Sequence, residues 1–76
     1  MKYVYNLKND EEVKYIIIEE DKDDTHGFFI YLHASLDEPC LYDGWALTLD
    51  EAMESIYEEY GVLKEEWLLT NELFIH

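Results

Sequence analysis

The sequence predicts an α+β fold, in which a small antiparallel β-sheet of three to five strands packs against one main α-helix. Short runs of β-branched and aromatic residues, separated by polar turns, fill the first half of the chain, and this pattern is typical of strands. A single stretch with helical spacing of apolar residues, about Leu49–Tyr60, follows them. Strands followed by one long helix favour a sheet that the helix covers on one face.

The whole chain, residues 1–76, is expected to form a single α+β domain. Its 76 residues are too few for two domains of ordinary size. A chain this short buries only about 60% of the surface that its unfolded form exposes. Hydrophobic residues make up 49% of the chain and aromatic residues 16%, unlike a disordered chain. A thin apolar core is therefore expected.

Three runs before the helix predict strands. They are "KYVYNL" (Lys2–Leu7), "VKYIIIEE" (Val13–Glu20) and "FFIYLHA" (Phe28–Ala34). The second and third runs flank a seven-residue acidic connection, residues 21–27, which indicates an antiparallel hairpin. The segment "SLDEPCLYDGW" after them reads as a loop, with a short strand near Cys40–Tyr42.

The sequence does not determine which side of each strand faces the helix, because both faces of "YIII" and "FFIYL" are apolar. Alternate residues of a strand point to opposite faces of the sheet, so one parity must be chosen for each strand. We place these residues beneath the helix: Tyr15, Ile17, Phe28, Ile30 and Leu32. We also expect both tryptophans, Trp45 and Trp67, to pack in the core.

The predicted helix has start and stop signals. Thr48, followed three residues later by Glu51, forms a capping box that satisfies free amides at the helix start. Gly61 stands where a left-handed C-terminal cap is expected. After it, "LKEEW" predicts a tight turn and "LLTNELFI" one or two last strands. The apolar residues at helical spacing mark the buried side: Leu49, Ala52, Met53, Ile56 and Tyr60.

Acidic residues outnumber basic residues by 19 to 5, which gives a formal charge of −14. Direct binding of nucleic acid is not expected, because affinity for phosphate is built from lysine and arginine. Docking on an anionic membrane is disfavoured for the same reason. A basic protein partner fits the charge, although acidity also aids solubility.

A cytoplasmic location is expected. The single cysteine, Cys40, excludes a disulfide within the chain and suits a reducing compartment. The first ten residues lack the apolar core of a signal peptide. No apolar run approaches the ~20 residues of a membrane-spanning helix.

No catalytic residue, metal site or cofactor is predicted. The acidic connection 21–27 does not place glycine and glutamate where a calcium loop needs them. The three histidines and Cys40 lack the spacing of zinc motifs. Acidic neighbours disfavour a reactive thiolate at Cys40. An enzyme would need a pocket that joins Cys40 and His33.

The outer side of the predicted helix carries five carboxylates and no lysine or arginine. Asp50, Glu54 and Glu58 follow one another at four-residue intervals, and each like-charge pair costs about 0.2–0.5 kcal/mol. The five charges spread over about 14 Å, or one per ~3.4 Å, close to the charge density along one DNA strand. The predicted partner-binding residues are Asp50, Glu51, Glu54, Glu58 and Glu59 on the helix, Asp23 and Asp24 in the acidic connection, and Tyr42 as an aromatic anchor.

The segment "YDGWALTLDEAMESIYEEYGV…EEW" resembles part of a group of small acidic bacterial proteins of uncharacterised function. They share an Asp, a Trp, a Thr or Ser cap, Glu-Ala, a helix that ends in an aromatic and Gly-Val or Gly-Ile, and a further Trp. The matching positions are Asp43, Trp45, Thr48, Glu51, Ala52, Tyr60, Gly61, Val62 and Trp67. Those proteins are similar in size and acidity to immunity proteins of polymorphic-toxin systems. The resemblance implies a similar fold and an inhibitory role, and no catalytic residue.

We therefore expect a non-enzymatic acidic binding protein that inhibits a basic partner by covering its positive surface. The partner would be a nuclease toxin or another nucleic-acid-handling enzyme, and the role that of an immunity or anti-defence protein. The alternative is a small self-associating structural protein, a homodimer joined through an exposed sheet edge or an apolar sheet face.

Overall fold

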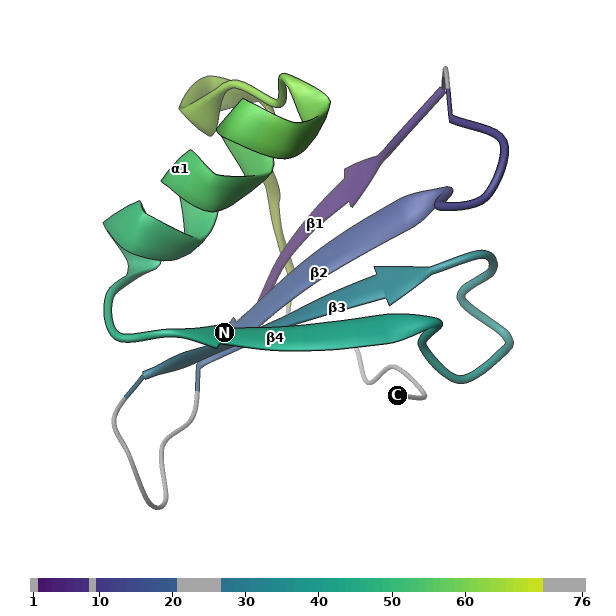
Figure 1. The fold of residues 1–76 in the computed structure, drawn as a ribbon, viewed down its shortest axis with the longest axis horizontal. Helices are drawn as coiled ribbons and strands as arrows, with labels where there is room; N and C mark the ends of the chain where they lie inside the picture. The colour runs from purple at the N-terminus through teal and green to yellow at the C-terminus, as the bar shows by residue number, and fades with distance from the viewer. Residues whose placement is uncertain (1, 9, 21–26, 71–76) are drawn as a thin grey trace.

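The structure, a computed structural model, describes residues 2–8, 10–20 and 27–70 of the chain. A five-stranded antiparallel sheet lies against one α-helix in this part of the chain (Figure 1), so the predicted α+β fold is confirmed. The elements in chain order are β1 (Lys2–Asn6), β2 (Tyr15–Glu20), β3 (Phe28–His33), β4 (Tyr42–Ala46), α1 (Leu49–Tyr60), the 3₁₀ turn η1 (Lys64–Glu66) and β5 (Leu68–Thr70).

The strand order in the sheet is β4-β3-β2-β1-β5, and every neighbouring pair is antiparallel. The β-branched strand β2 lies at the centre, with β1 and β3 on either side. After the helix the chain returns to the far side of β1, where Leu68 of β5 lies opposite Val4. The two edge strands are therefore β4 and β5, and α1 covers one face of the sheet (Figure 1).

The core lies between α1 and the sheet. Ile16 and Ile18 of β2 are completely buried there, against Ala52, Met53 and Ile56 of α1. Full burial of a side chain of this size contributes about 1.5–3 kcal/mol, so these few contacts supply much of the stability of so short a chain. Four further buried residues complete this core, namely Leu7, Val13, Val62 and Trp67.

The predicted inward side of β2 was wrong, whereas that of β3 is confirmed. Ile16 lies opposite Leu32 and Ile18 opposite Ile30, so the even-numbered residues of both strands face the helix with Phe28. The register places Tyr15 and Ile17 on the other face, where Ile17 is nonetheless completely buried. The sequence pattern could not separate the two sides, because Ile17 is as apolar as its two neighbours and a shift of one residue exchanges the faces.

The strand predicted near Cys40–Tyr42 also lies elsewhere. β4 begins at Tyr42 and runs to Ala46, so "DGWA" is part of the strand rather than of a loop. Asp and Gly are depleted in strands, but five consecutive residue pairs with β3 hold this segment in the sheet. Pairing with a neighbouring strand outweighs the weak local preference of Asp43 and Gly44.

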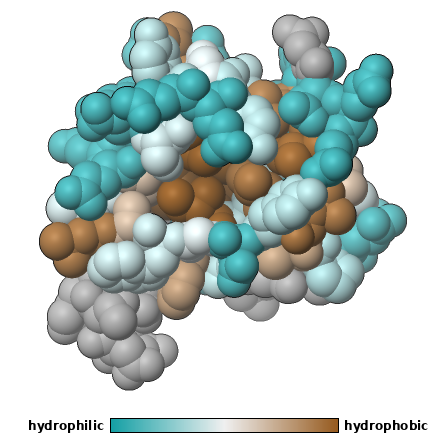
Figure 2. Space-filling view, in the orientation of Figure 1, coloured by the Kyte–Doolittle hydropathy of each residue, from teal (hydrophilic) through white to brown (hydrophobic). Residues whose placement is uncertain are grey.

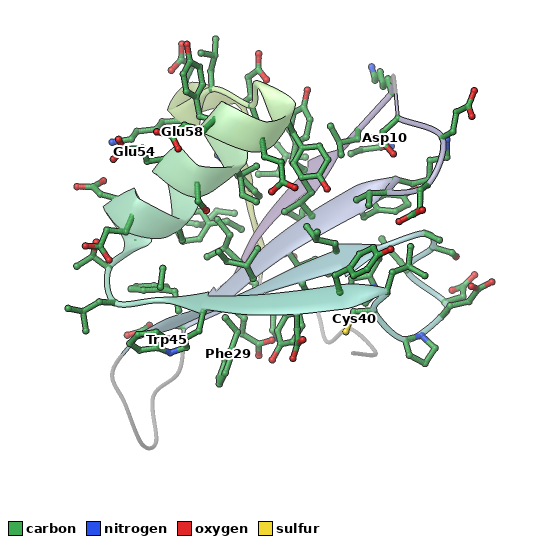
Figure 3. The ribbon with its side chains drawn as sticks, viewed as in Figure 1. Asp10, Phe29, Cys40, Trp45, Glu54 and Glu58 are labelled. Carbon is green, nitrogen blue, oxygen red and sulfur yellow. The ribbon has the colours of Figure 1, made fainter. Side chains whose placement is uncertain are left out.

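The two tryptophans have different environments. Trp67 is buried in the core, where its ring centroid lies 6.1 Å from that of Tyr5. Trp45 is not a core residue, since it is 46% exposed and points away from α1 on the other side of the sheet (Figure 3). Its indole lies so close to Gly27 that a Cβ there would come within 2.1 Å of Trp45 Cζ2. A side chain at position 27 would therefore clash with the Trp45 ring, and glycine leaves room for it.

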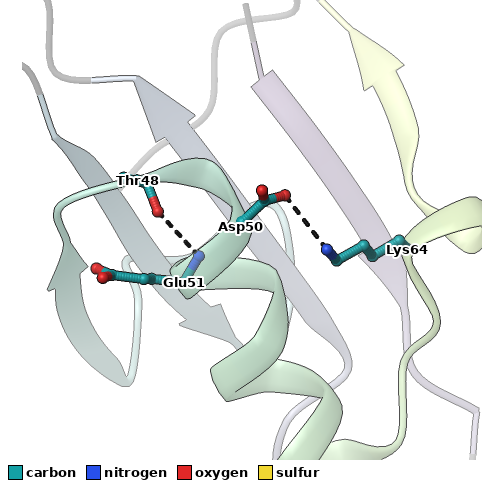
Figure 4. Close-up of polar contacts among 4 residues, drawn as sticks. All are labelled: Thr48, Asp50, Glu51 and Lys64. Carbon is teal, nitrogen blue, oxygen red and sulfur yellow. Dashed lines mark hydrogen bonds and ion pairs between the residues drawn. The ribbon is translucent and has the colours of Figure 1, made fainter.

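The Thr48 hydroxyl half of the predicted capping box and the predicted glycine cap are formed. Thr48 Oγ1 accepts a hydrogen bond from the backbone N–H of Glu51 at 3.1 Å (Figure 4). At the other end, Gly61 has φ 75° and donates its N–H to the carbonyl of Tyr57 at 2.8 Å. The turn at Gly61 then directs Val62 back into the core.

Replacing Gly61 with alanine should destabilise the fold by about 1–2 kcal/mol, the cost of a left-handed conformation for a residue with a Cβ. The matched control is Gly44→Ala, where the new Cβ meets only Ile30 Cβ at 3.9 Å and no positive φ is required. Urea unfolding measures both free energies, and Gly44→Ala should stay within about 0.5 kcal/mol of the native chain. Equal losses for the two variants would contradict this account of the helix end.

Candidate functional site

The packing of α1 onto the sheet determines where its carboxylates lie. Because Ala52, Met53 and Ile56 face inward, the acidic residues of the helix are directed to solvent. Figure 2 shows hydrophilic side chains over the outer side of α1 and hydrophobic ones between the helix and the sheet. All five predicted helix residues are exposed, namely Asp50, Glu51, Glu54, Glu58 and Glu59.

These five carboxylates do not form a single face. At 3.6 residues per turn, Glu51, Glu54 and Glu58 fall within about 60° of one another around the helix axis, whereas Glu59 lies about 100° from Glu58. Glu59 instead lines a hollow at the end of the helix together with Lys8 and Asp10. The outward acidic ridge therefore consists of Glu51, Glu54 and Glu58, of which Figure 3 labels the last two.

One helix carboxylate is neutralised by the chain itself. Lys64 Nζ lies 3.3 Å from Asp50 Oδ1 (Figure 4), and both side chains are well exposed. An exposed pair of this kind contributes little to stability. Among the described residues, no lysine nitrogen lies within 4.0 Å of a carboxylate oxygen of Glu51, Glu54, Glu58 or Glu59.

Of the other three described lysines, Lys2 and Lys14 contact β2 or the turn before it, and Lys8 lies at the surface. Lys2 is buried and its Nζ lies 3.9 Å from Glu19 Oε1. Lys14 donates to the backbone carbonyl of Asp10. Lys8 is exposed and lines the same hollow as Glu59. Lys2–Glu19 and Lys64–Asp50 are the ion pairs between side chains of the described residues, so the acidic ridge of α1 shares its lack of a lysine partner with exposed carboxylates elsewhere, such as Glu11 and Glu20.

Tyr42 belongs to a different part of the surface from the acidic ridge. It is 54% exposed, at the start of the edge strand β4, and its hydroxyl is hydrogen-bonded to the Glu12 carboxylate. That bond and the charge of Glu12 raise the pKa of Tyr42 above 10.0. Burial, and then the charges of Glu59 and Asp10, raise the pKa of Tyr60 close by.

The turn between β1 and β2 explains why Asp10 stays charged beside these groups. Its carboxylate accepts hydrogen bonds from the backbone amides of Val13 at 2.8 Å and Glu12 at 2.9 Å. These two bonds hold the pKa of Asp10 below its usual value. Asp10 is therefore a structural carboxylate that fixes the turn.

Two of the predicted partner-binding residues, Asp23 and Asp24, lie outside the described residues. The structure instead draws attention to two apolar side chains that sequence reasoning did not select. Tyr57 is 52% exposed and Leu63 is 42% exposed, and both border a hollow beside Glu54. The sequence gives only a weak signal for these two residues. Tyr57 lies one position after Ile56 of the buried helix side, and Leu63 lies one position after the buried Val62, so each reads as an ordinary neighbour of a core residue.

The structure describes both residues that were considered for catalysis, His33 and Cys40. The imidazole of His33 is completely buried, with Nδ1 3.1 Å from the backbone oxygen of Glu38, so it ties the following loop to the sheet. Cys40 is a partly exposed thiol before β4. In the described ranges, no three His, Cys, Asp or Glu side chains are grouped so as to hold a metal ion. None of the described helices has the length and apolar content that a membrane crossing requires.

Comparison of the chain with protein-family models, with curated proteins and with solved structures gives no match. The function is therefore best approached through the chain's own surface chemistry. On that surface the acidic ridge of α1 places three like charges close together on one rigid element, and local folding requirements do not explain it.

Replacing Glu12 with glutamine should lower the pKa of Tyr42 towards 10.0, because the variant removes a charge and weakens the bond that favours the neutral phenol. In the native chain the pKa of Tyr42 is higher in the folded than in the unfolded state, so its neutral phenol stabilises the fold. This stabilisation is complete below about pH 10 and is lost as the pH rises through the folded-state pKa. NMR titration of the Tyr42 ring measures the pKa directly. Asp50→Asn serves as the charge-matched control and should leave it unchanged. An unshifted Tyr42 titration in Glu12→Gln would contradict the described bond.

Proposed function

We propose that the protein is a non-enzymatic binding protein that inhibits a basic partner by covering its positive surface. The partner is a nuclease toxin or another nucleic-acid-handling enzyme, and the protein acts as an immunity or anti-defence protein. The observation that carries this proposal is the acidic ridge of Glu51, Glu54 and Glu58. These carboxylates have no lysine within 4.0 Å among the described residues.

Electrostatics supports an inhibitor of this kind. A formal charge of −14 on 76 residues attracts a cationic surface over long range and speeds association with it. Nucleases and other nucleic-acid-handling enzymes have positive clefts because they bind phosphate. An anionic ridge therefore competes with the nucleic acid for that cleft. The likeness in size and acidity to immunity proteins of polymorphic-toxin systems agrees with the same role.

The test is inhibition of a captured basic partner at two salt concentrations. Binding should be strong at about 0.05 M salt and much weaker at about 0.5 M, where the Debye length has fallen to a few ångströms. Glu54→Gln/Glu58→Gln should weaken inhibition at least about tenfold. The matched control, Glu11→Gln/Glu20→Gln, removes the same charge at exposed positions outside α1. This control should change inhibition about twofold at most.

The proposal fails if the captured partner is neutral or acidic, if capture is insensitive to salt, or if the two double variants weaken inhibition equally. In the last case the net charge alone, and not the ridge on α1, determines binding.

Self-association is the second candidate function, and the edge strand β5 favours it. Leu68 is 69% exposed and Leu69 is 55% exposed, on a strand at the end of the sheet. Exposed apolar edge strands are templates for pairing with another chain. If this reading is correct, light scattering gives a homodimer mass that does not change with salt, and Leu68→Lys returns the mass to that of a monomer.

A further inference from the structure

A shallow groove lies between the helix and the 3₁₀ turn that follows it. Its lining residues define the α1–η1 groove: Met53, Glu54 and Tyr57 from α1, and Leu63, Lys64 and Glu65 after the helix. The floor is the buried Met53, and the half-exposed Tyr57 and Leu63 form the sides. The groove therefore presents apolar surface in the middle of the acidic side of the molecule.

The helix end creates this groove. The left-handed turn at Gly61 sends Val62 into the core, and the next residue, Leu63, points to solvent. The chain then runs back beside α1, where Lys64 reaches Asp50 in the first helical turn (Figure 4). Both walls are held by backbone structure, so the groove exists before any partner binds.

The size of the groove limits what can occupy it. Its volume is about 290 Å³, at the lower end of the roughly 300–1,000 Å³ of small-molecule pockets. An open hollow of this size suits one or two large apolar side chains of a protein partner. Such an anchor residue, surrounded by weaker contacts, is the usual way in which a protein interface gains affinity.

Charge around the groove determines the chemistry of its occupant. Glu54 and Glu65 line the groove and Asp50 pairs with its Lys64, so three carboxylates stand against the single ammonium of Lys64. An acidic segment would be repelled here, whereas lysines or arginines on both sides of an apolar anchor would meet carboxylates. The one local cation, Lys64, competes with them for Asp50.

We propose that the α1–η1 groove is the docking site for a short cationic segment of the partner. One large apolar side chain of that segment enters between Tyr57 and Leu63, and its flanking lysines or arginines meet Glu54 and Glu65. This inference rests on the proposed function and deepens it, because it names the apolar contact with the partner. That contact is made by Tyr57 and Leu63 in the groove rather than by Tyr42. Tyr42 lies outside, with its hydroxyl bonded to Glu12.

Two synthetic peptides of equal positive charge serve as probes. Both carry lysines around a central pair of residues, which is Leu-Trp in one peptide and Ser-Gly in the other. Titration followed by ¹⁵N amide shifts gives the affinity and the location of each. The Leu-Trp peptide should bind roughly tenfold more tightly and should shift the amides of Tyr57 and Leu63.

Variants of the full chain then test the groove itself. Leu63→Ser should weaken binding of the Leu-Trp peptide roughly tenfold. Leu47→Ser, an equal change at a 58% exposed leucine outside the groove, should leave it within about twofold. Lys64→Ala should tighten binding of both peptides, because it removes the competing cation from Asp50. Tyr57→Ser provides a second loss-of-anchor variant, and thermal unfolding confirms that each variant is folded.

The outcomes separate this inference from the proposed function. If both peptides bind equally, or if Leu63→Ser and Tyr57→Ser leave the affinity unchanged, the groove proposal is overturned while salt-sensitive binding of cations still supports the inhibitor. If neither peptide binds even at low salt, the acidic surface does not recognise cationic segments and both proposals fall.

Discussion

The burial of Ile16 and Ile18 beneath α1 is the contact on which the rest of the structure depends. The central strand β2 brings these two side chains to one face of the sheet, and the apolar stripe of the helix, with Ile56 at its middle, covers them. A helix that turns its apolar stripe inward directs its remaining side chains to solvent. The same packing that stabilises the fold therefore places Glu54 and Glu58 on the outer surface. The position of the charge follows from the hydrophobic core.

That charge acts against the helix that carries it. Glu54 and Glu58 repel each other at a spacing of four residues. The last turn carries no basic residue, so Glu58 and Glu59 also face the unfavourable end of the helix dipole. Packing and the two caps offset this cost. Local rules of stability are most often broken where a surface has a function to perform, and the acidic ridge of α1 breaks two of them. The ion pair of Asp50 with Lys64 only partly relieves it.

The parts of the fold that were predictable are those with a local physical cause. The Thr48 cap, the Gly61 stop and the helical spacing between them identify α1 with its observed bounds. Longer-range choices were not predictable: the inward side of β2 depends on its register with β3, and the strand at Asp43–Trp45 depends on pairing alone. For the candidate site, charge could be read from the sequence, but the groove could not. Leu63 lines it only because the chain turns back after the helix.

The most direct test of the central claim, an acidic surface that the chain itself leaves unneutralised, is the dependence of stability on salt. Urea unfolding of the isolated protein should be followed from about 0.02 M to about 0.3 M NaCl, a range in which screening becomes effective over about one helical turn. We expect the free energy of unfolding to rise with salt, and to rise less steeply in Glu54→Gln/Glu58→Gln. A free energy that stays constant or falls would mean that internal ion pairs already balance the carboxylates, and no cationic partner would then be needed to explain them.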